Sequence, residues 1–403
     1  MDTNEINIGI KRYIILTYLI ILIPSIIANA VGYEYRQTLT ILTCISLALS
    51  TIIPYILYRK PIPVSISLIS TVFLTYQIVL GKNLPWSVAV AGIVVEAILL
   101  LSLSISSFKR ELLKAFPPFL RFGLIVSAGI YLIYVGFVET GFLTELNNYF
   151  FTIPDFLSPN TLISFAVLVI AAFLMDKRFY GAMLLSIIIG FIIFILITNT
   201  IIEIPTWSFD SSFLKLADIN SLMNAQLFSV IITLFLIEAF HTEEIEMAHS
   251  LRKSDFKILT ASTLNTFINS FLLLPSVVGS AETAKLKGGL LSVLITTSLF
   301  LITIFVANYI SLIPYSISAA LLIIYGAILF SLIKRVKIET IEEILTLAML
   351  IGGTLAFKSP AHAFTFSLLF YIFMKIVKNE AKEVHPILYI ILVLLLMDYF
   401  RVI

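Results

Sequence analysis

Apolar runs long enough to cross a membrane follow one another along the whole chain of 403 residues. A hydrocarbon core about 30 Å thick needs roughly 20 apolar residues per helix. Hydrophobic residues make up 60% of the sequence and charged residues only 12%, against about 25% charged in ordinary soluble domains. The pattern predicts an all-α polytopic membrane protein. It excludes a soluble enzyme, a nucleic-acid-binding protein and a disordered chain.

Charged residues, prolines and glycines divide the chain into fourteen apolar segments and one further apolar stretch, 386–402, which either crosses the membrane or lies along its cytoplasmic interface. The connections between segments are too short to hold a soluble domain. The fourteen segments are 13–31, 38–58, 64–80, 86–107, 119–141, 160–175, 179–202, 222–246, 256–274, 276–284, 289–310, 314–334, 341–357 and 360–378.

The placement of basic residues tests this count independently, because cytoplasmic loops carry an excess of Lys and Arg. With a cytoplasmic N-terminus and alternating segments, 21 of the 26 Lys and Arg residues fall in inside loops and only four in outside loops. A miscounted span would have placed basic loops on both sides. The distribution therefore favours fourteen crossings with the N-terminus in the cytoplasm.

Two segments make poor membrane helices. The third opens with Pro61 and Pro63 and continues with alternating apolar and hydroxyl residues, and the tenth, 275–289, is short and interrupted by proline, glycine and charge. Each is the third segment of its half. Paired interrupted segments indicate a transporter binding site, since non-helical backbone at membrane depth needs protein or water to satisfy it. The pattern predicts a 7+7 inverted repeat with a site between the two broken segments.

Five ordered stretches resemble known family patterns. Tyr18–Gly32 is similar to the first-span pattern Y-I-x-x-x-N-P-x-I-L-x-x-A-G of the nucleobase–cation symporter (xanthine/uracil permease) family. The final stretch, Lys382–Tyr389, resembles the K-x-V-H-P-x-x-Y pattern of its AzgA-like branch of hypoxanthine/guanine/adenine permeases. The remaining three stretches are Leu120–Phe142, Phe179–Ile187 and Ile313–Gly326. Together they identify the chain as a divergent member of this branch.

The resemblance implies two domains. A core domain, residues 1–112 and 222–311, would carry the substrate, and a gate domain, residues 113–221 and 312–403, would support it. The core would move against the gate in an elevator-like motion. The resemblance also implies a location in the cell membrane and, by analogy with the fold, a homodimer.

The family's site motifs are altered in this chain. The asparagine of the third-span motif P-G-M-G-L-N-A-x-F-A-Y is replaced by Thr71. In the eighth-span motif D-x-F-D-T-x-G-T the first acid is retained as Glu238, whereas the substrate-binding acid is His241. In the tenth span Ser280 takes the place of the family's glutamate, and Glu282 follows two residues later.

These positions supply the candidate site residues. Glu238 lies inside an apolar segment, where an ionised carboxylate costs about 3 kcal/mol, so it is expected to bind substrate or a coupling proton, the alternative being a neutral structural role. His241 lies one helical turn away and is a second candidate for both roles, against a simple helix–helix hydrogen bond. Glu282 is a third candidate, with an ion pair to a neighbouring lysine as the alternative.

Further residues complete the predicted substrate site. Thr71 and Ser280 are expected where two half-helices begin, beside free N–H groups that suit a polar ligand, although hydroxyls there are also natural caps. Thr242 belongs to the same eighth-span motif. Phe73 is placed to stack on a flat base, against ordinary packing. Glu96, in the fourth segment, is interpreted as structural.

We expect a secondary active transporter of purine-like nucleobases, coupled to protons or to sodium and embedded in the lipid bilayer. The sequence holds no P-loop, and the single cysteine, Cys44, cannot alone make a thiolate metal site, so no enzyme activity, cofactor, metal or nucleic-acid partner is expected. One alternative is an anion transporter on the same fold, because His241 and Ser280 remove negative charge from the site. The other is a homologue that has lost transport and acts through partner contacts.

Overall fold

The structure, a computed structural model, describes residues 3–105, 108–146, 150–152, 158–199, 205–216, 228–248 and 257–397. Within these ranges the chain is predominantly helical, with two short antiparallel strand pairs. Eight of the described helical stretches are long and apolar enough to cross a membrane. The prediction of a helical polytopic membrane protein is confirmed at this level.

The elements of the first half follow the predicted segments closely. They are α1 (Thr3–Val31), η1 (Tyr33–Tyr35), α2 (Arg36–Tyr58), β1 (Val64–Ile66), α3 (Leu68–Val72), the π-helix η2 (Phe73–Val79), α4 (Leu80–Lys82), α5 (Trp86–Ile105), α6 (Phe108–Ala115), α7 (Pro118–Glu139), β2 (Thr144–Leu146), β3 (Phe150–Thr152), α8 (Pro159–Asp176), α9 (Ala182–Thr198) and η4 (Ser211–Leu216). Helix α6 was not expected.

The second half follows the prediction except in its third segment. Its elements are α10 (Phe228–Ala248), α11 (Lys257–Phe271), β4 (Val277–Gly279), α12 (Leu290–Thr303), η7 (Ile304–Val306), α13 (Ala307–Ile310), α14 (Tyr315–Phe330), η8 (Ser331–Arg335), α15 (Ile341–Ala356), α16 (Pro360–Val377), η9 (Ala381–Glu383) and α17 (Pro386–Leu396). The end of the predicted stretch 386–402, from residue 398, lies outside the described residues.

The expected half-helix beginning at Ser280 is wrong. Residues 281–285 form turns after β4, and the next helix begins only at Leu290. The stretch between Pro275 and the pair Gly288–Gly289 is short, and nucleating a helix in so few residues is costly. Strand and turn replace the second half-helix.

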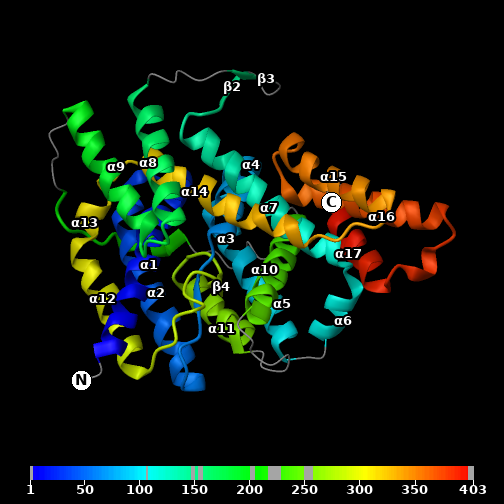
Figure 1. Cartoon of the computed structure of the whole chain (residues 1–403), viewed down its shortest axis with the longest axis horizontal. Coiled ribbons are helices and arrows are strands. Elements are labelled where there is room, and N and C mark those ends of the chain that lie inside the picture. Colours follow the sequence, from blue (N-terminus) through cyan, green and yellow to red (C-terminus); the bar gives the residue numbers. More distant parts are fainter. Residues whose placement is uncertain are drawn as a thin grey trace.

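The helices pack in two groups (Figure 1). In one group α1, α2 and α12 lie together, and α5 and α10 pack with α11 beside them. In the other group α7 packs extensively on α14, α8 lies against α9 and α14, and α15 pairs with α16. The two groups are also in contact with each other, because α10 packs against α7, α16 and α17, and α1 packs against α9 and α14.

A glycine pair brings α7 and α14 into close contact. A Cβ added at Gly129 would lie 2.7 Å from the backbone oxygen of Gly326, and Gly326 faces Gly129 in the same way. Small residues at a helix crossing let the two backbones approach, which is a common way to pack membrane helices. The α7–α14 crossing is therefore rigid and intolerant of side chains.

Strands β1 and β4 pair antiparallel near the middle of the molecule (Figure 1), with Ser65 opposite Val278. Side chains of α11 satisfy the buried backbone around β4. Thr266 accepts a hydrogen bond from the Val277 N–H at 2.9 Å, and Asn269 donates to the Pro275 carbonyl at 2.8 Å. This pairing meets the requirement that non-helical backbone at membrane depth be satisfied by protein.

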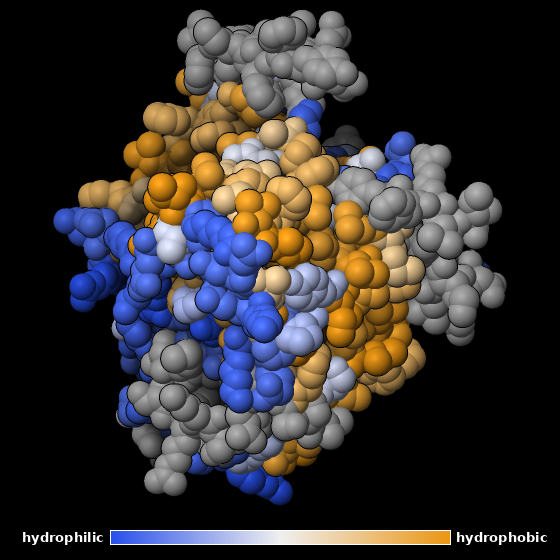
Figure 2. Space-filling model, turned by 90° about the vertical axis from the view of Figure 1, so that its right-hand side faces the viewer, coloured by the Kyte–Doolittle hydropathy of each residue, from blue (hydrophilic) through white to orange (hydrophobic). Residues whose placement is uncertain are grey.

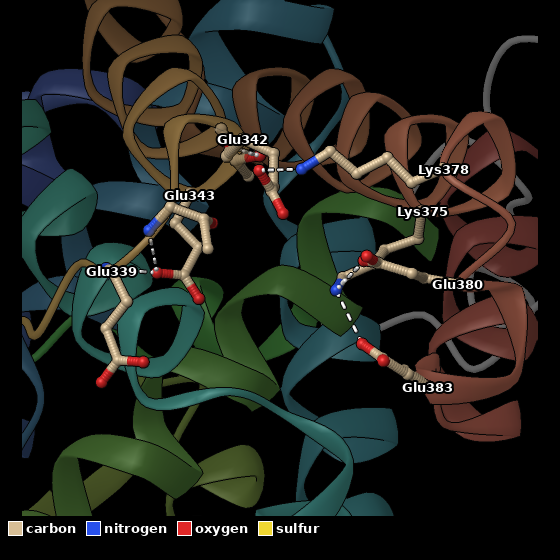
Figure 3. A network of polar contacts seen from close by, with 9 residues as sticks. Glu339, Glu342, Glu343, Lys375, Lys378, Glu380 and Glu383 are labelled. Atoms are coloured by element: carbon tan, nitrogen blue, oxygen red, sulfur yellow. Dashed lines mark hydrogen bonds and ion pairs between the residues drawn. The ribbon is translucent and has the colours of Figure 1, made fainter.

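Charged residues gather where α15 begins and α16 ends (Figure 3). Lys378 contacts Glu342 at 2.6 Å, and Lys375 contacts Glu380 at 2.7 Å and Glu383 at 2.8 Å. Acidic residues in a first helical turn and basic residues in a last turn also suit the helix dipole. The face of the molecule on this side shows a concentrated hydrophilic area next to hydrophobic surface (Figure 2), as expected where a membrane helix meets water.

Candidate functional site

The scaffold of the candidate site is the β1–β4 junction. The ladder continues beyond the strands, because the Ser67 N–H donates to the Ser276 carbonyl at 2.8 Å and the Ser280 N–H donates to the Pro63 carbonyl at 2.8 Å. Ser67 then caps α3 by accepting a hydrogen bond from the Ser70 N–H at 3.1 Å. The junction thus places the start of α3 beside the residues that precede β4, and the turn after β4 beside the residues that precede β1.

A small cavity of about 40 Å³ lies against this junction. Three of the predicted site residues line it, namely His241 from α10 and Ser280 and Glu282 from the turn after β4. Tyr18 from α1, Ser65 from β1 and Tyr325 from α14 complete its polar lining. We call it the junction cavity. Residues that are distant in the sequence therefore converge on one buried polar space.

Glu282 is the acidic group of the junction cavity. The Tyr18 hydroxyl donates a hydrogen bond to its carboxylate at 2.8 Å. Glu282 also lines a second cavity of about 240 Å³, formed with Arg178 and Tyr180 of the connection between α8 and α9. The carboxylate therefore stands between the junction cavity and a larger space. It does not form an ion pair with a lysine of its own turn among the ion pairs of the described residues.

His241, which lines the junction cavity, carries a buried ring nitrogen without a hydrogen-bond partner in the part of the chain that the structure describes. Its side chain is buried, and its Nδ1 has no hydrogen-bond partner among the described residues. An unpaired buried polar atom is costly, so such atoms are usually completed by water or a ligand. Nδ1 is available to accept a hydrogen bond or, when protonated, to donate one.

Glu238 lies behind the junction rather than in the cavity. It is fully buried, and the Ser276 hydroxyl contacts its two carboxylate oxygens at 2.9 and 2.8 Å. Glu96 of α5 is also fully buried, with its carboxyl group within hydrogen-bonding reach of Glu238. Glu238 is therefore connected to the β1–β4 junction by its hydrogen bonds with Ser276, the residue that directly precedes β4.

Three other predicted site residues do not line the junction cavity. Thr71 is fully buried in α3 and donates to the Ser67 carbonyl at 2.6 Å. Phe73 is fully buried and meets Tyr131 of α7 edge-on, with 5.5 Å between ring centroids. Thr242 is buried next to His241. These side chains are therefore part of the protein interior outside the junction cavity.

Sequence reasoning missed several residues of the site. Tyr18 opens the first-span stretch that carries the family resemblance, so the signal was present but was not read as a site residue. Ser276 follows Pro275 directly in the irregular tenth segment, and hydroxyl residues there are natural partners for buried carboxylates. Tyr325 stands in an apolar run in which nothing in the sequence distinguishes it from packing aromatics.

A second polar cluster joins the two packed groups on another part of the molecule. The Asn29 amide donates to the Tyr76 hydroxyl at 3.2 Å and to the Glu139 carboxylate at 3.3 Å. The hydroxyls of Tyr76 and Tyr315 lie 2.9 Å apart. Next to this cluster Tyr76, with Gln77 and residues of α7 and α16, lines a cavity of about 430 Å³, here called the α7–α16 cavity.

The acidic end of α10 is neutralised by lysine and arginine from two directions. Lys109 of α6 contacts Glu243 at 2.6 Å, and Arg335 of η8 pairs with Glu244. The second pair joins the α10 side of the molecule to α14 and η8. Glu243 and Glu244 are therefore paired, as expected for charges at the end of a membrane span.

Comparison with known proteins places the chain in a family. Residues 4–243, more than half of the chain, match the model of the permease family Xan_ur_permease. A putative permease of Methanocaldococcus jannaschii is 23% identical and aligns over 96% of this chain and 92% of its own length. The guanine/hypoxanthine permease PbuG of Bacillus subtilis is 24% identical, aligning over 96% and 93%. The adenine permease AdeP of Escherichia coli is 22% identical, aligning over 98% and 92%.

Solved structures show the same fold. The transmembrane domain of the cyanobacterial bicarbonate transporter BicA superposes with a TM-score of 0.60 at 14% identity, covering 90% of this chain and 96% of that one. The murine anion transporter Slc26a9 superposes with a TM-score of 0.59 at 11% identity, covering 94% and 69%. At such identities the likeness concerns the fold alone. The family match, extended by relatives that align over nearly the whole chain, shows that this protein belongs to the permease family.

Proposed function

We propose that this protein is a secondary active transporter of purine-like nucleobases. The aligned relatives include a guanine/hypoxanthine permease and an adenine permease. The observation that carries the proposal is the junction cavity, where the unpartnered Nδ1 of His241, the Ser280 hydroxyl and the Glu282 carboxylate converge. A purine presents alternating donors and acceptors around a flat ring, and this set offers both an acceptor and donors at short range.

The substrate roles follow from placement. Glu282, His241 and Ser280 address the polar edges of the base directly. Glu238 supports them through Ser276 and takes part in coupling. Thr71, Phe73 and Thr242 shape the wall behind the ligand. The apolar residues of the junction cavity, Leu19, Ile66 and Ile328, then cover the ring faces.

Transport requires the site to open, because a space of about 40 Å³ is close to the roughly 30 Å³ that one water occupies. A displacement of one packed group against the other enlarges it. We assign residues 1–112 and 222–311 to a moving core domain and residues 113–221 and 312–403 to a gate domain. Close α7–α14 packing through Gly129 and Gly326 supports a rigid gate, which is what an elevator-like mechanism needs.

The membrane topology completes the proposal. Fourteen crossings in a 7+7 inverted repeat place β1 and β4 at matching positions of the two halves. The bias of Lys and Arg supports a cytoplasmic N-terminus in the cell membrane. Protons are the proposed coupling ion, with sodium as the alternative, and the functional unit is proposed to be a homodimer.

Uptake into proteoliposomes tests the function. Labelled hypoxanthine, guanine, adenine, uracil and sulfate are compared at two pH values, with protein-free liposomes as the control. We expect uptake of at least one purine that increases with an inward proton gradient. Uptake of sulfate without any purine would instead establish an anion transporter, and no uptake of any solute would favour a homologue that has lost transport.

A further inference from the structure

Two carboxyl groups lie close together behind strand β4, in a part of the protein that does not line the junction cavity. Glu96 comes from α5 and Glu238 from α10, which pack side by side. Neither side chain has any exposed surface, and the two carboxyl groups are within hydrogen-bonding reach. A hydrogen bond between two carboxyl groups requires a proton on one of them, because two carboxylates offer only acceptors.

The hydrogen-bond donors are distributed unequally between the two groups. Glu238 accepts from the Ser276 hydroxyl at 2.8 Å and interacts with the Ser67 hydroxyl. Ser276 also lies near Glu96, but its hydroxyl is within hydrogen-bonding distance of both oxygens of Glu238 and of neither oxygen of Glu96. Neither oxygen of Glu96 has a hydrogen-bond donor among the described residues. Glu238 is therefore the member suited to be a carboxylate, and Glu96 is the member suited to hold a proton.

The surroundings provide no cation that could replace this proton. Among the ion pairs of the described residues none includes Glu96 or Glu238. Tyr325 of α14 interacts electrostatically with Glu238, and His241 lies three residues after Glu238 on α10. The described part of α11 carries one charged residue, Lys257 at its first position, and η2 carries only Tyr76.

We propose that Glu96 carries the coupling proton of this transporter and shares it with Glu238. This inference rests on the proposed function and adds a residue that the sequence alone suggested was structural. Two like charges in one buried site cannot both persist, so the pair retains a proton until water reaches it. Release of that proton leaves two carboxylates that repel each other.

The pair is mechanically linked to the substrate site. Ser276 bonds Glu238 through its hydroxyl, while its N–H donates to Ser70 at 3.3 Å and its carbonyl accepts from the Ser67 N–H at 2.8 Å. A change of charge on the pair therefore acts on the residues that join β4 to the start of α3. Proton occupancy and the shape of the junction cavity are coupled through these serines.

The test compares Glu96→Gln with Glu96→Asp in protein reconstituted into nanodiscs and proteoliposomes. Glu111→Gln, on the exposed surface of α6, is the matched control. The wild type is expected to show an infrared C=O band of a protonated carboxyl group, which Glu96→Gln loses and Glu96→Asp keeps. Thermal unfolding of each variant establishes that it is folded.

Transport provides the second readout. One titrating proton changes wild-type hypoxanthine uptake by up to about tenfold per pH unit. Glu96→Gln is expected to bind hypoxanthine and exchange it across the membrane, but to lose the pH dependence of net uptake, whereas Glu96→Asp retains it. A wild-type pH profile in Glu96→Gln, or an unchanged infrared band, overturns the proposal.

The two proposals fail in different ways. If the wild type neither binds nor transports any nucleobase, the proposed function is wrong, and the infrared band still decides whether Glu96 holds a buried proton. If the wild type transports hypoxanthine in a pH-dependent manner and Glu96→Gln does the same, the function stands and the role of Glu96 is wrong.

Discussion

The third and tenth segments look equivalent in the sequence but differ in the folded protein. Each supplies one strand of the β1–β4 pair. After β1, Ser67 caps a helix, and the chain continues through the fully buried α3 and the mostly buried π-helix η2. After β4 no helix forms, and the turn places Ser280 and Glu282 against the junction cavity.

This difference teaches that the two halves of the junction have different main tasks: the tenth segment supplies the carboxylate, whereas the third segment contributes Ser65 and Ile66 to the junction cavity and is otherwise structural. A helix satisfies its own backbone and buries side chains, so the third segment gives rigidity. A turn leaves polar groups free to meet a ligand, so the tenth segment gives recognition. Substitutions on either side of the junction test this division, because stability and nucleobase binding should respond differently on the two sides.

The largest effect is expected from Glu282. Glu282→Gln keeps the size of the side chain but removes the charge that accepts from Tyr18 at 2.8 Å. A hydrogen bond to a charged group is worth about 1.5–3 kcal/mol, so nucleobase uptake should fall by roughly 10- to 100-fold. Initial rates in proteoliposomes measure this, and Glu343→Gln at the start of α15 serves as a control. Uptake equal to that of the wild type would remove Glu282 from the site.

Ser276 should come next, because it joins the tenth segment to Glu238. Ser276→Ala removes a donor to a buried carboxylate and is expected to destabilise the protein by about 1–3 kcal/mol. Thermal unfolding in detergent measures the loss, and Ser276→Thr, which retains the hydroxyl, should recover part of it. Unchanged stability in Ser276→Ala would show that Glu238 does not depend on this serine.

A matched pair of serines tests the division directly. Ser67→Ala removes the cap of α3 and should cost about 1 kcal/mol of stability. Ser280→Ala removes a hydroxyl that caps no helix, so its stability should change less while nucleobase affinity falls. Thermal unfolding and equilibrium binding of hypoxanthine are measured on both variants. The reverse pattern, with Ser67 controlling affinity and Ser280 controlling stability, would contradict the division.

The smallest effect is expected from Thr71. Its hydroxyl bonds the Ser67 carbonyl within its own helix at 2.6 Å, and the side chain does not line the junction cavity. Thr71→Val should therefore cost less than about 1.5 kcal/mol of stability and leave the apparent affinity for hypoxanthine close to that of the wild type. A selective loss of affinity would show that α3 contacts the ligand in addition to the β1 residues that line the junction cavity.

Much of the fold could be predicted because membrane helices are specified by local apolar length. The predicted segment 38–58 corresponds to the observed helix Arg36–Tyr58, and the predicted segment 119–141 corresponds to the helix Pro118–Glu139. The two irregular segments were recognised from proline, glycine and hydroxyl patterns. What followed each strand was not predictable, because the difference between a capped helix and a turn depends on contacts with α11 and α1 that no local pattern encodes.

The site was only partly predictable for the same reason. Glu238, His241 and Glu282 were identified because polar residues in apolar segments are conspicuous. Their neighbours were not: Tyr18 and Tyr325 resemble ordinary packing aromatics until the helices are assembled. Glu96 looked structural, since nothing in the sequence reveals that it lies within reach of a second carboxyl group.

The most direct test of the nucleobase site is an experimental structure of the protein in nanodiscs with bound hypoxanthine. The account predicts density for the base next to the β1–β4 junction, between His241 and Glu282, with the core displaced enough to widen the junction cavity. Density for the base in the α7–α16 cavity, or anywhere away from these two residues, would contradict it.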